Sequence, residues 1–249
     1  ILEYEKPFVA VELLNAMGIW PQFNLGTFQD LDLLIQRIKR IHSFTNYLAN
    51  AAEQKDVEFL FVSSFIAASH PYRRKLADII FDTNLSGRKL LGLIYLAAML
   101  WNQEDDIAIQ DPLALSKEES EDLSGLLSNK NIFHLFAANN KHIDRREIYL
   151  YFKSLGKMGL ILPIISLAET SQKTSTELNY DLWIREIECV ERIFSVWFDS
   201  PEIIDPTPLI TGKNLMFDFD LTPGPFYGNL LEGLREEQAA GTITTHQEA

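Results

Sequence analysis

Two short stretches of the chain concentrate basic side chains in a protein that is acidic overall. Between His70 and Lys89 there are five lysines and arginines against two acids, and the same numbers hold between Lys141 and Lys157. Side chains of this kind bind phosphate oxygens, so both stretches are candidate contacts for the backbone of a nucleic acid. The alternative is that each stretch is an ordinary solvated helix face, neutralised by neighbouring acids and water.

The overall composition limits how such contacts could be used. The 249 residues include 22 lysines and arginines against 35 aspartates and glutamates, which gives a net charge of −13. This balance argues against a protein that binds nucleic acid over its whole surface. It is compatible only with local basic patches.

Signatures of common enzyme classes are missing from the sequence. The phosphate-binding loop, the dinucleotide-binding glycines, the nucleophile elbow and the zinc-protease helix all have no counterpart. No two histidines fall at the spacing of ligands on one helix face, and a metal shared by His134 and His142 is the less favoured alternative to surface histidines. Cys189, the only cysteine, lies on the apolar face of an expected helix, which favours core packing over a nucleophile. We therefore expect no catalytic residue and no metal ligand in this chain.

The elements that position the basic residues are expected to be helices. Apolar residues recur at helical spacing along most of the chain, no strand-like alternation is sustained, and glycine and proline are few, so the sequence predicts an all-α protein. The segment 87–101 is apolar almost all round and is expected to be a buried central helix. The expected helices cover residues 8–17, 27–48, 55–69, 71–84, 87–101, 117–136, 144–156, 160–170 (interrupted by Pro163), 179–198 and 228–240.

The C-terminal fifth of the chain differs from the rest because prolines and glycines gather between residues 201 and 228. We expect a helical body in two parts, 1–115 and 116–200, and a turn-rich tail at 201–249 with one last helix, all forming one contiguous unit. The longest apolar run, Leu90–Trp101, is too short to span a bilayer, and no secretory signal is visible, so we expect a cytoplasmic protein without a membrane partner. Because the chain begins at Ile1 rather than Met, we expect it to be a piece of something longer.

The tail carries an ordered motif that resembles a known family. Residues Pro208–Ala249 resemble the C-terminal segment of bacterial tRNA nucleotidyltransferases and poly(A) polymerases, the CCA-adding enzymes of the polymerase-β-like superfamily. Upstream, Asp144–Phe152, Leu160–Thr170 and Val11–Phe23 resemble the body of these proteins, so the resemblance spans nearly the whole chain. The matching tail residues are Gly212, Lys213, Leu215, Met216, Pro223, Gly224, Pro225, Gly228, Gln238, Gly241, Ile243, Thr244, Glu248 and Ala249.

The resemblance also implies what this chain lacks. In the family, an N-terminal head holds two metal ions and a nucleoside triphosphate with a Gly-Gly-x-x-Arg-Asp stretch followed by an Asp-x-Asp pair, and that combination does not occur here. Mg²⁺ and nucleotide are therefore expected only for the missing head, and the chain alone is expected to be inactive. Many relatives also carry a metal-dependent HD-type domain. Its His-Asp doublet is replaced here by Trp101-Asn102, which implies a degenerate HD-like body without its metal.

The function implied by the resemblance is a helical arm that holds tRNA, or another structured RNA, while the head adds nucleotides. The expected partners are that RNA and the head, not DNA. The second candidate function is a protein-interaction or regulatory domain that kept the fold and lost RNA binding. The acidity of the chain supports this alternative. An active metal-dependent phosphohydrolase is disfavoured, because Trp101-Asn102 replaces the His-Asp doublet. The candidate RNA contacts are Arg145, Arg146, Lys153, Lys157, Lys213, Arg73 and Arg74.

Overall fold

A computed structural model describes residues 2–3, 5–20, 30–50, 59–83, 87–102, 113–139, 143–172, 179–217 and 224–249. Five residues named above lie outside this part of the chain, and so do the first residues of the expected helices 27–48 and 55–69 and the last residue of the expected helix 71–84. The five are Ile1, Phe23, Lys141, His142 and Pro223.

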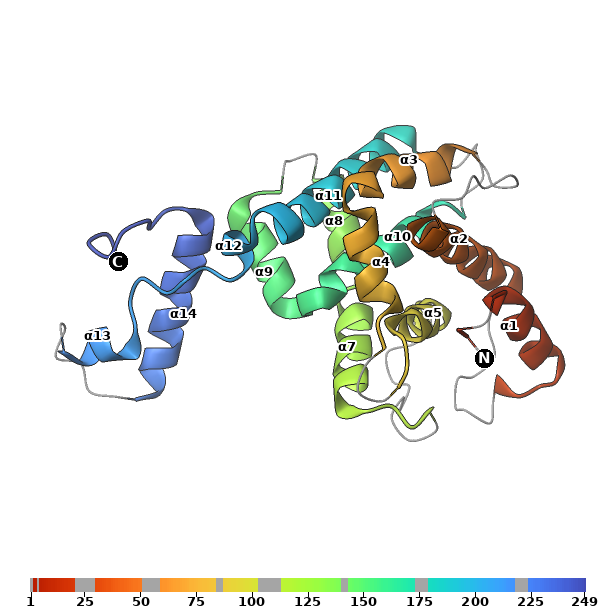
Figure 1. Cartoon of the computed structure of the whole chain (residues 1–249), viewed down its shortest axis with the longest axis horizontal. Coiled ribbons are helices and arrows are strands. Elements are labelled where there is room, and N and C mark those ends of the chain that lie inside the picture. Colours follow the sequence, from red (N-terminus) through yellow and green to blue (C-terminus); the bar gives the residue numbers. More distant parts are fainter. Residues whose placement is uncertain are drawn as a thin grey trace.

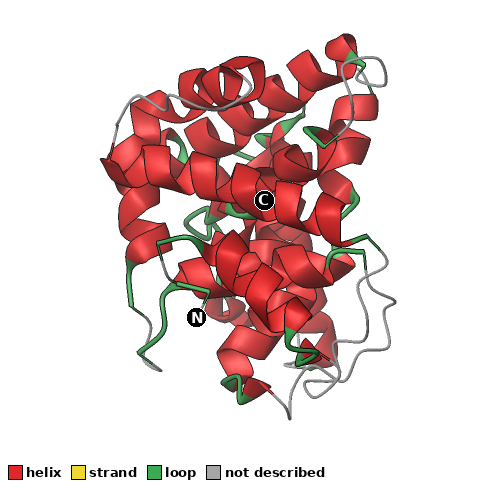
Figure 2. Ribbon diagram, turned by 90° about the vertical axis from the view of Figure 1, so that its right-hand side faces the viewer, coloured by secondary structure: helices red, strands yellow, loops and turns green. Residues whose placement is uncertain are grey.

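The described residues form helices and loops, without a β-strand, which confirms the all-α prediction (Figure 2). A single isolated bridge between Thr83 and Lys89 is the one β-type pairing among them. The α-helices are α1 (Pro7–Ala16), α2 (Leu31–Asn50), α3 (Phe59–Ser69), α4 (Arg73–Phe81), α5 (Leu90–Leu100), α7 (Lys117–Ser128), α8 (Ile132–Ala138), α9 (Arg145–Leu155), α10 (Leu162–Thr170), α11 (Tyr180–Asp199), α12 (Pro201–Ile204), α13 (Gly212–Phe217) and α14 (Pro225–Ala240). Two 3₁₀ turns, His70–Tyr72 and Gly156–Leu160, precede α4 and follow α9.

Polar caps explain where several of these helices begin. Ser116 and Glu119 form a reciprocal capping box at the start of α7, and Asp144 and Glu147 form another at the start of α9. In each box the first side chain accepts a hydrogen bond from the backbone of the second, which satisfies amide groups that have no partner inside the helix. Asn179 caps α11 in the same way through the amide of Leu182.

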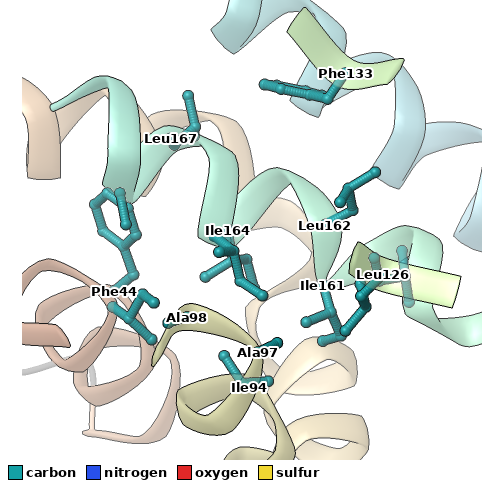
Figure 3. Close-up of a cluster of buried hydrophobic side chains, with 14 of the residues drawn as sticks. Phe44, Ile94, Ala97, Ala98, Leu126, Phe133, Ile161, Leu162, Ile164 and Leu167 are labelled. Carbon is teal, nitrogen blue, oxygen red and sulfur yellow. The ribbon is translucent and has the colours of Figure 1, made fainter. Parts of the chain in front are cut away.

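The hydrophobic core of the body surrounds α10. Every residue of α10 from Leu162 to Ala168 is buried, and α2, α5, α7 and α8 supply side chains to its surface (Figure 3). In Figure 3, Ile164 of α10 faces Phe44 of α2 and Ile94 of α5. All residues of α5 from Leu93 to Leu100 are buried too, so the expectation of a buried helix there is confirmed.

Some helix boundaries differ from the expected ones. Helix α5 begins at Leu90 rather than at residue 87, and the expected helix 117–136 is broken between α7 and α8 at residues 129–131. Pro163 does not interrupt a helix. It lies in the first turn of α10, where a proline loses no helical hydrogen bond. The last helix begins at Pro225 for the same reason, three residues before the expected start.

The tail helices stand at one end of the molecule. Figure 1 shows α14 beside α9 and α12, and α13 farther out beside α14, away from the helices α1–α5. Among the described residues no single helix is long and apolar enough to cross a membrane. The bent pair of helices Arg145–Leu160 and Leu162–Thr170 could span a membrane by length and composition only. Most of its apolar side chains are buried in the core.

Gly159 lies so close to two buried aromatic rings that a larger residue cannot fit. A Cβ atom there would come within 2.7 Å of Phe152 Cε1 and 2.9 Å of Tyr151 Cε1. We expect Gly159→Ala to lower the free energy of unfolding by about 1–3 kcal/mol, as overpacked core substitutions do. Urea unfolding, followed by circular dichroism, measures this change in the free energy of unfolding.

Gly125→Ala is the matched control, because a Cβ atom at this position of α7 meets nothing within 4 Å. It should raise the free energy of unfolding by about 0.5–1 kcal/mol, since alanine is the better helix former. Equal effects of the two substitutions would show that the rings move aside for residue 159.

Candidate functional site

Helix α9 places the candidate RNA-binding residues. Its capping box fixes Arg145 and Arg146 in the first turn, and Lys153 follows about two turns later on the side of Arg146. The opposite side of the helix, which includes Ile148, Tyr151 and Phe152, is buried in the body. Arg146 and Lys153 therefore form a basic row on one face of α9, and this face meets the tail.

Acidic residues of α14 cover that row. Arg146 forms ion pairs with Glu236, at 2.9 Å from Nε to Oε1, and with Glu237. Lys153 Nζ pairs with Glu232 at 2.5 Å, and the hydroxyl of Tyr149 donates a hydrogen bond of 2.7 Å to the same carboxylate. The three glutamates follow one another at helical spacing, so they form a single acidic face of α14.

These contacts change the acidity of the groups involved. Lys153 and then Tyr149, through their hydrogen bonds, hold the pKa of Glu232 below its usual value of 4.5. Burial, together with the hydrogen bond to Glu232, raises the pKa of Tyr149 far above its usual 10.0. At neutral pH the tyrosine is therefore protonated and the glutamate ionised, which is the arrangement that the hydrogen bond needs.

Arg145 contacts the C-terminal end of the tail helix. Its Nε donates a hydrogen bond of 2.9 Å to the carbonyl oxygen of Ala239, one of the last carbonyls of α14. A cation at this position is also favoured by the negative end of the helix dipole. The guanidinium lies against Gly241, which ends α14 with φ +82°, a conformation that residues with a Cβ atom rarely adopt.

Lys157 is separated from the other three cations. It follows α9 on the 3₁₀ turn and reaches α7, where Nζ lies 3.0 Å from Glu118 Oε1 and 3.6 Å from Asp122 Oδ2. Partial burial opposes its charge, but these two acids together raise the pKa of Lys157 above its usual value. The structure thus brings Arg145, Arg146 and Lys153 together at α14 and places Lys157 against a different helix.

The remaining candidates lie on α4 and α13. Arg73 Nη1 donates a hydrogen bond of 2.7 Å to the carbonyl oxygen of Leu48 near the end of α2. Arg74 and Lys213 are exposed, and no ion pair with another described residue is present for either. Helix α4 belongs to the body and α13 to the far end of the tail, so these residues do not form one patch (Figure 1).

The tail also exposes aromatic rings that the sequence pattern did not single out. Phe217, at the end of α13, is 75% exposed, and Phe226, in the first turn of α14, is 64% exposed. An amphipathic pattern over α13 is hard to recognise in six residues, which explains why Phe217 was missed. Exposed rings on the same segment as a cation such as Lys213 can stack on nucleic-acid bases.

A buried arginine fills the position next to Trp101-Asn102. Arg37 of α2 is 2% exposed, donates a hydrogen bond of 2.9 Å to the carbonyl oxygen of Ala98 and lies 3.5 Å from Glu169 of α10. With its amide turned to satisfy both neighbours, Asn102 accepts from Arg37 at 2.8 Å and donates to Glu169 at 3.3 Å. Trp101 packs into the core.

This arrangement does not fit a divalent cation. A guanidinium already neutralises the one carboxylate, and an amide and an indole are poor ligands or none. Among the described residues, no group of three or more histidines, cysteines, aspartates or glutamates could hold a metal ion.

Other titratable residues lie in structural positions. His134 Nδ1 lies 2.6 Å from Oε1 of the fully buried Glu186, which also accepts a hydrogen bond from Thr170. Burial, and then the charge of Glu186, raise the pKa of Cys189 to about 12. His70 lies 2.8 Å from the hydroxyl of Tyr47. Within the described residues the histidines are therefore dispersed rather than clustered.

The α9–α14 contact is testable by charge reversal. Lys153→Glu and Glu232→Lys each place like charges at the contact, so amide hydrogen exchange in α14 should accelerate roughly two- to fivefold, as expected for exposed ion pairs. The double exchange should restore most of the protection, but not all, because Tyr149 loses its acceptor. Lys117→Glu, which breaks an exposed pair with Glu121 on α7, is the control and should leave α14 unchanged.

The same contact should weaken in acid. Because the pKa of Glu232 is lowered, its contribution is complete above its usual pKa of 4.5 and is lost as the pH falls through the lowered value. The protection of α14 amides, corrected for intrinsic exchange, should therefore drop selectively in this acidic range. Equal loss of protection in Glu232→Gln would assign the effect to another group.

Sixty residues of the chain are 40% identical to part of an A-adding tRNA nucleotidyltransferase from Deinococcus radiodurans. They make up 24% of this chain and 13% of that protein, so the match spans a small fraction of the relative's length. No protein-family model matches the chain, and no solved structure matches it. A region of this all-α chain is thus related to a tRNA nucleotidyltransferase.

Proposed function

We propose that this chain is the RNA-holding body and tail of a protein of the tRNA nucleotidyltransferase/poly(A) polymerase kind, acting in tRNA 3′-end processing. Nucleotide addition is then the work of a catalytic head outside this chain. The observation that carries the proposal is the region 40% identical to an A-adding tRNA nucleotidyltransferase. An arm of this kind needs only rigid shape and correctly placed cations, because folded RNA is recognised largely through its phosphates and 2′-hydroxyls.

The cations differ in how readily RNA can reach them. Arg74 and Lys213 are exposed and have no carboxylate partner among the described residues, so a phosphate can bind them without displacing a protein group. Phe217 and Phe226 add stacking surfaces to the tail that carries Lys213. We assign the first RNA contacts to this tail surface, composed of Lys213, Phe217 and Phe226, and to Arg74.

The α9 cations can contribute only by exchanging partners. Arg146, Lys153 and Lys157 keep 44%, 45% and 43% of their side chains exposed, so phosphates can approach them. Each already has a glutamate or aspartate partner, which an RNA phosphate must displace. Arg73 and Arg145 use donors on backbone carbonyls and keep others for RNA. For Arg146, Lys153 and Lys157 we therefore expect a smaller effect on RNA affinity than for Lys213 and Arg74.

The same ion pairs support the second candidate function, a protein-interaction or regulatory domain. In a chain of net charge −13, the acidic face of α14 neutralises the best basic row of the body. If RNA does not bind, the remaining role of such a fold is contact with another protein, for which its exposed aromatic tail is suited.

RNA binding is tested by filter binding of a tRNA transcript at several salt concentrations. Lys213→Glu combined with Arg74→Glu should weaken binding strongly and flatten the plot of log K against log salt, by roughly 0.7–0.9 for each phosphate that is no longer neutralised. Arg146→Glu with Lys153→Glu should have a smaller effect. Lys117→Glu, a highly exposed charge reversal on α7, is the control for charge alone.

Two outcomes would contradict this assignment. Equal losses of affinity in the control and in the Lys213/Arg74 variant would indicate a general effect of net charge. Failure of the wild-type chain to bind tRNA at low salt would favour the protein-interaction domain.

We also propose that the HD-type metal site is lost in this chain, with Arg37 taking the place of a metal-borne positive charge. Millimolar Mn²⁺ should then leave the melting temperature unchanged, because a ligand stabilises a protein only if it binds the folded state. An increase in melting temperature that disappears in Glu169→Gln would demonstrate a working metal site beside Asn102 and overturn this proposal.

A further inference from the structure

Three arginines line one cavity at the junction of body and tail. The cavity has a volume of about 380 Å³, and its walls are Ile143, Asp144, Arg145, Arg146, Arg192 and Ala240. Arg145 and Arg146 come from the start of α9, Arg192 comes from α11, and Ala240 is the last residue of α14. Segments distant in the sequence thus converge on a small, strongly basic space in an acidic protein.

Arg192 is the unusual member of this group. Its Nε atom is buried and has no hydrogen-bond partner among the described residues. A buried donor without a partner lowers stability, because the water that it loses on folding is not replaced. No ion pair between Arg192 and a carboxylate is present among the described residues, so its positive charge is also uncompensated there.

Arg145 and Arg146 leave donors available beside it. Arg145 uses Nε on the carbonyl of Ala239 and has no described carboxylate partner. Arg146 is paired with Glu236 and Glu237 on the tail side. Asp144 is the one acid in the wall, and its carboxylate is committed to the amide of Glu147. The walls therefore carry three guanidinium groups against one carboxylate, and Arg145 and Arg192 keep donors that no described carboxylate occupies.

We propose that this cavity binds a phosphate group through Arg145, Arg146 and Arg192. Guanidinium groups present pairs of N–H donors that match two phosphate oxygens, and three of them can surround one tetrahedral anion. The volume is at the lower end of the ~300–1,000 Å³ range of ligand pockets, which suits a phosphate with a part of the group it is attached to. The phosphate can belong to RNA, which rests on the proposed function, or to a small phosphorylated molecule, which does not.

Occupancy should also strengthen the junction. The walls belong to two body helices and to the end of α14, so a bound phosphate joins body and tail through its oxygens. Binding should therefore slow amide exchange in α14 and raise the melting temperature, in addition to giving a direct binding signal.

The test titrates the full chain with inorganic phosphate and with pyrophosphate, followed by calorimetry and by the Nε–Hε resonance of Arg192. The wild-type chain should bind, with a shift of that resonance and slower exchange in α14. Arg192→Gln should lose about tenfold or more in affinity, the typical effect of removing a charged hydrogen-bond donor. Without phosphate it should melt no earlier than wild type, because it removes an unpaired buried donor.

Two further variants keep the test decisive. Arg185→Gln lies on the same helix, but Arg185 Nε donates to the carbonyl of Ala137, away from the cavity, so phosphate affinity should stay unchanged. Ala240→Glu keeps all three arginines and gives them an internal carboxylate, so it should compete with phosphate even if Arg192→Gln folds poorly. No binding by the wild-type chain, or equal binding by wild type and Ala240→Glu, would overturn the proposal.

The source of the phosphate is decided by a second comparison. A short RNA with a 5′-phosphate and the same RNA without it are each titrated into wild type and Arg192→Gln. Equal loss of affinity for both RNAs in Arg192→Gln assigns the pocket to a backbone phosphate, and loss confined to the phosphorylated RNA assigns it to a terminal one. Inorganic phosphate binding without tRNA binding would refute the proposed function while leaving the pocket intact.

Discussion

Helix α9 has to satisfy two neighbours of opposite character, and the arrangement of body and tail depends on it. One face is apolar and buried in the body, where Tyr151 and Phe152 pack closely on Gly159 of the following 3₁₀ turn. The other face is basic and binds the acidic face of α14. Because the first contact is hydrophobic and the second is mostly ionic, salt and acid should weaken the second contact more than the first.

The ionic contact also affects the RNA binding that we propose. The glutamates of α14 occupy the donors that a phosphate would use, so the tail helix acts as an internal competitor for the basic row. Tail residues outside this contact, Lys213, Phe217 and Phe226, remain exposed. The surface offered to a partner is therefore decided more by what α14 covers than by the number of cations in the sequence.

Local sequence signals predicted the helices well, because caps and apolar spacing act over a few residues. The apolar character of the segment 87–101 predicted the burial of α5. The partners of the cations were not predictable in this way. Arg146 and Glu237 lie 91 residues apart, and only the folded chain brings them together.

The direction that the chain takes after a helix ends was equally hard to predict from the sequence. Lys153 and Lys157 are four residues apart and would share a face if α9 continued. The helix ends at Leu155, and the turn that follows carries Lys157 towards α7 instead. The position of Arg37 was also hidden, because a single arginine in an amphipathic helix normally indicates an exposed residue. Its burial depends on Ala98 and Glu169, which come from two other helices.

The burial of Cys189 has a practical consequence for following the tail in solution. This residue is the only cysteine of the chain, and a pKa of about 12 keeps its sulfur almost entirely in the unreactive thiol form at neutral pH. A cysteine introduced at an exposed position of α13 would therefore be alkylated selectively without replacing the native one. A fluorescent dye attached there would report the rotational freedom of the tail against the body, in free protein and in complexes, on a background without competing label.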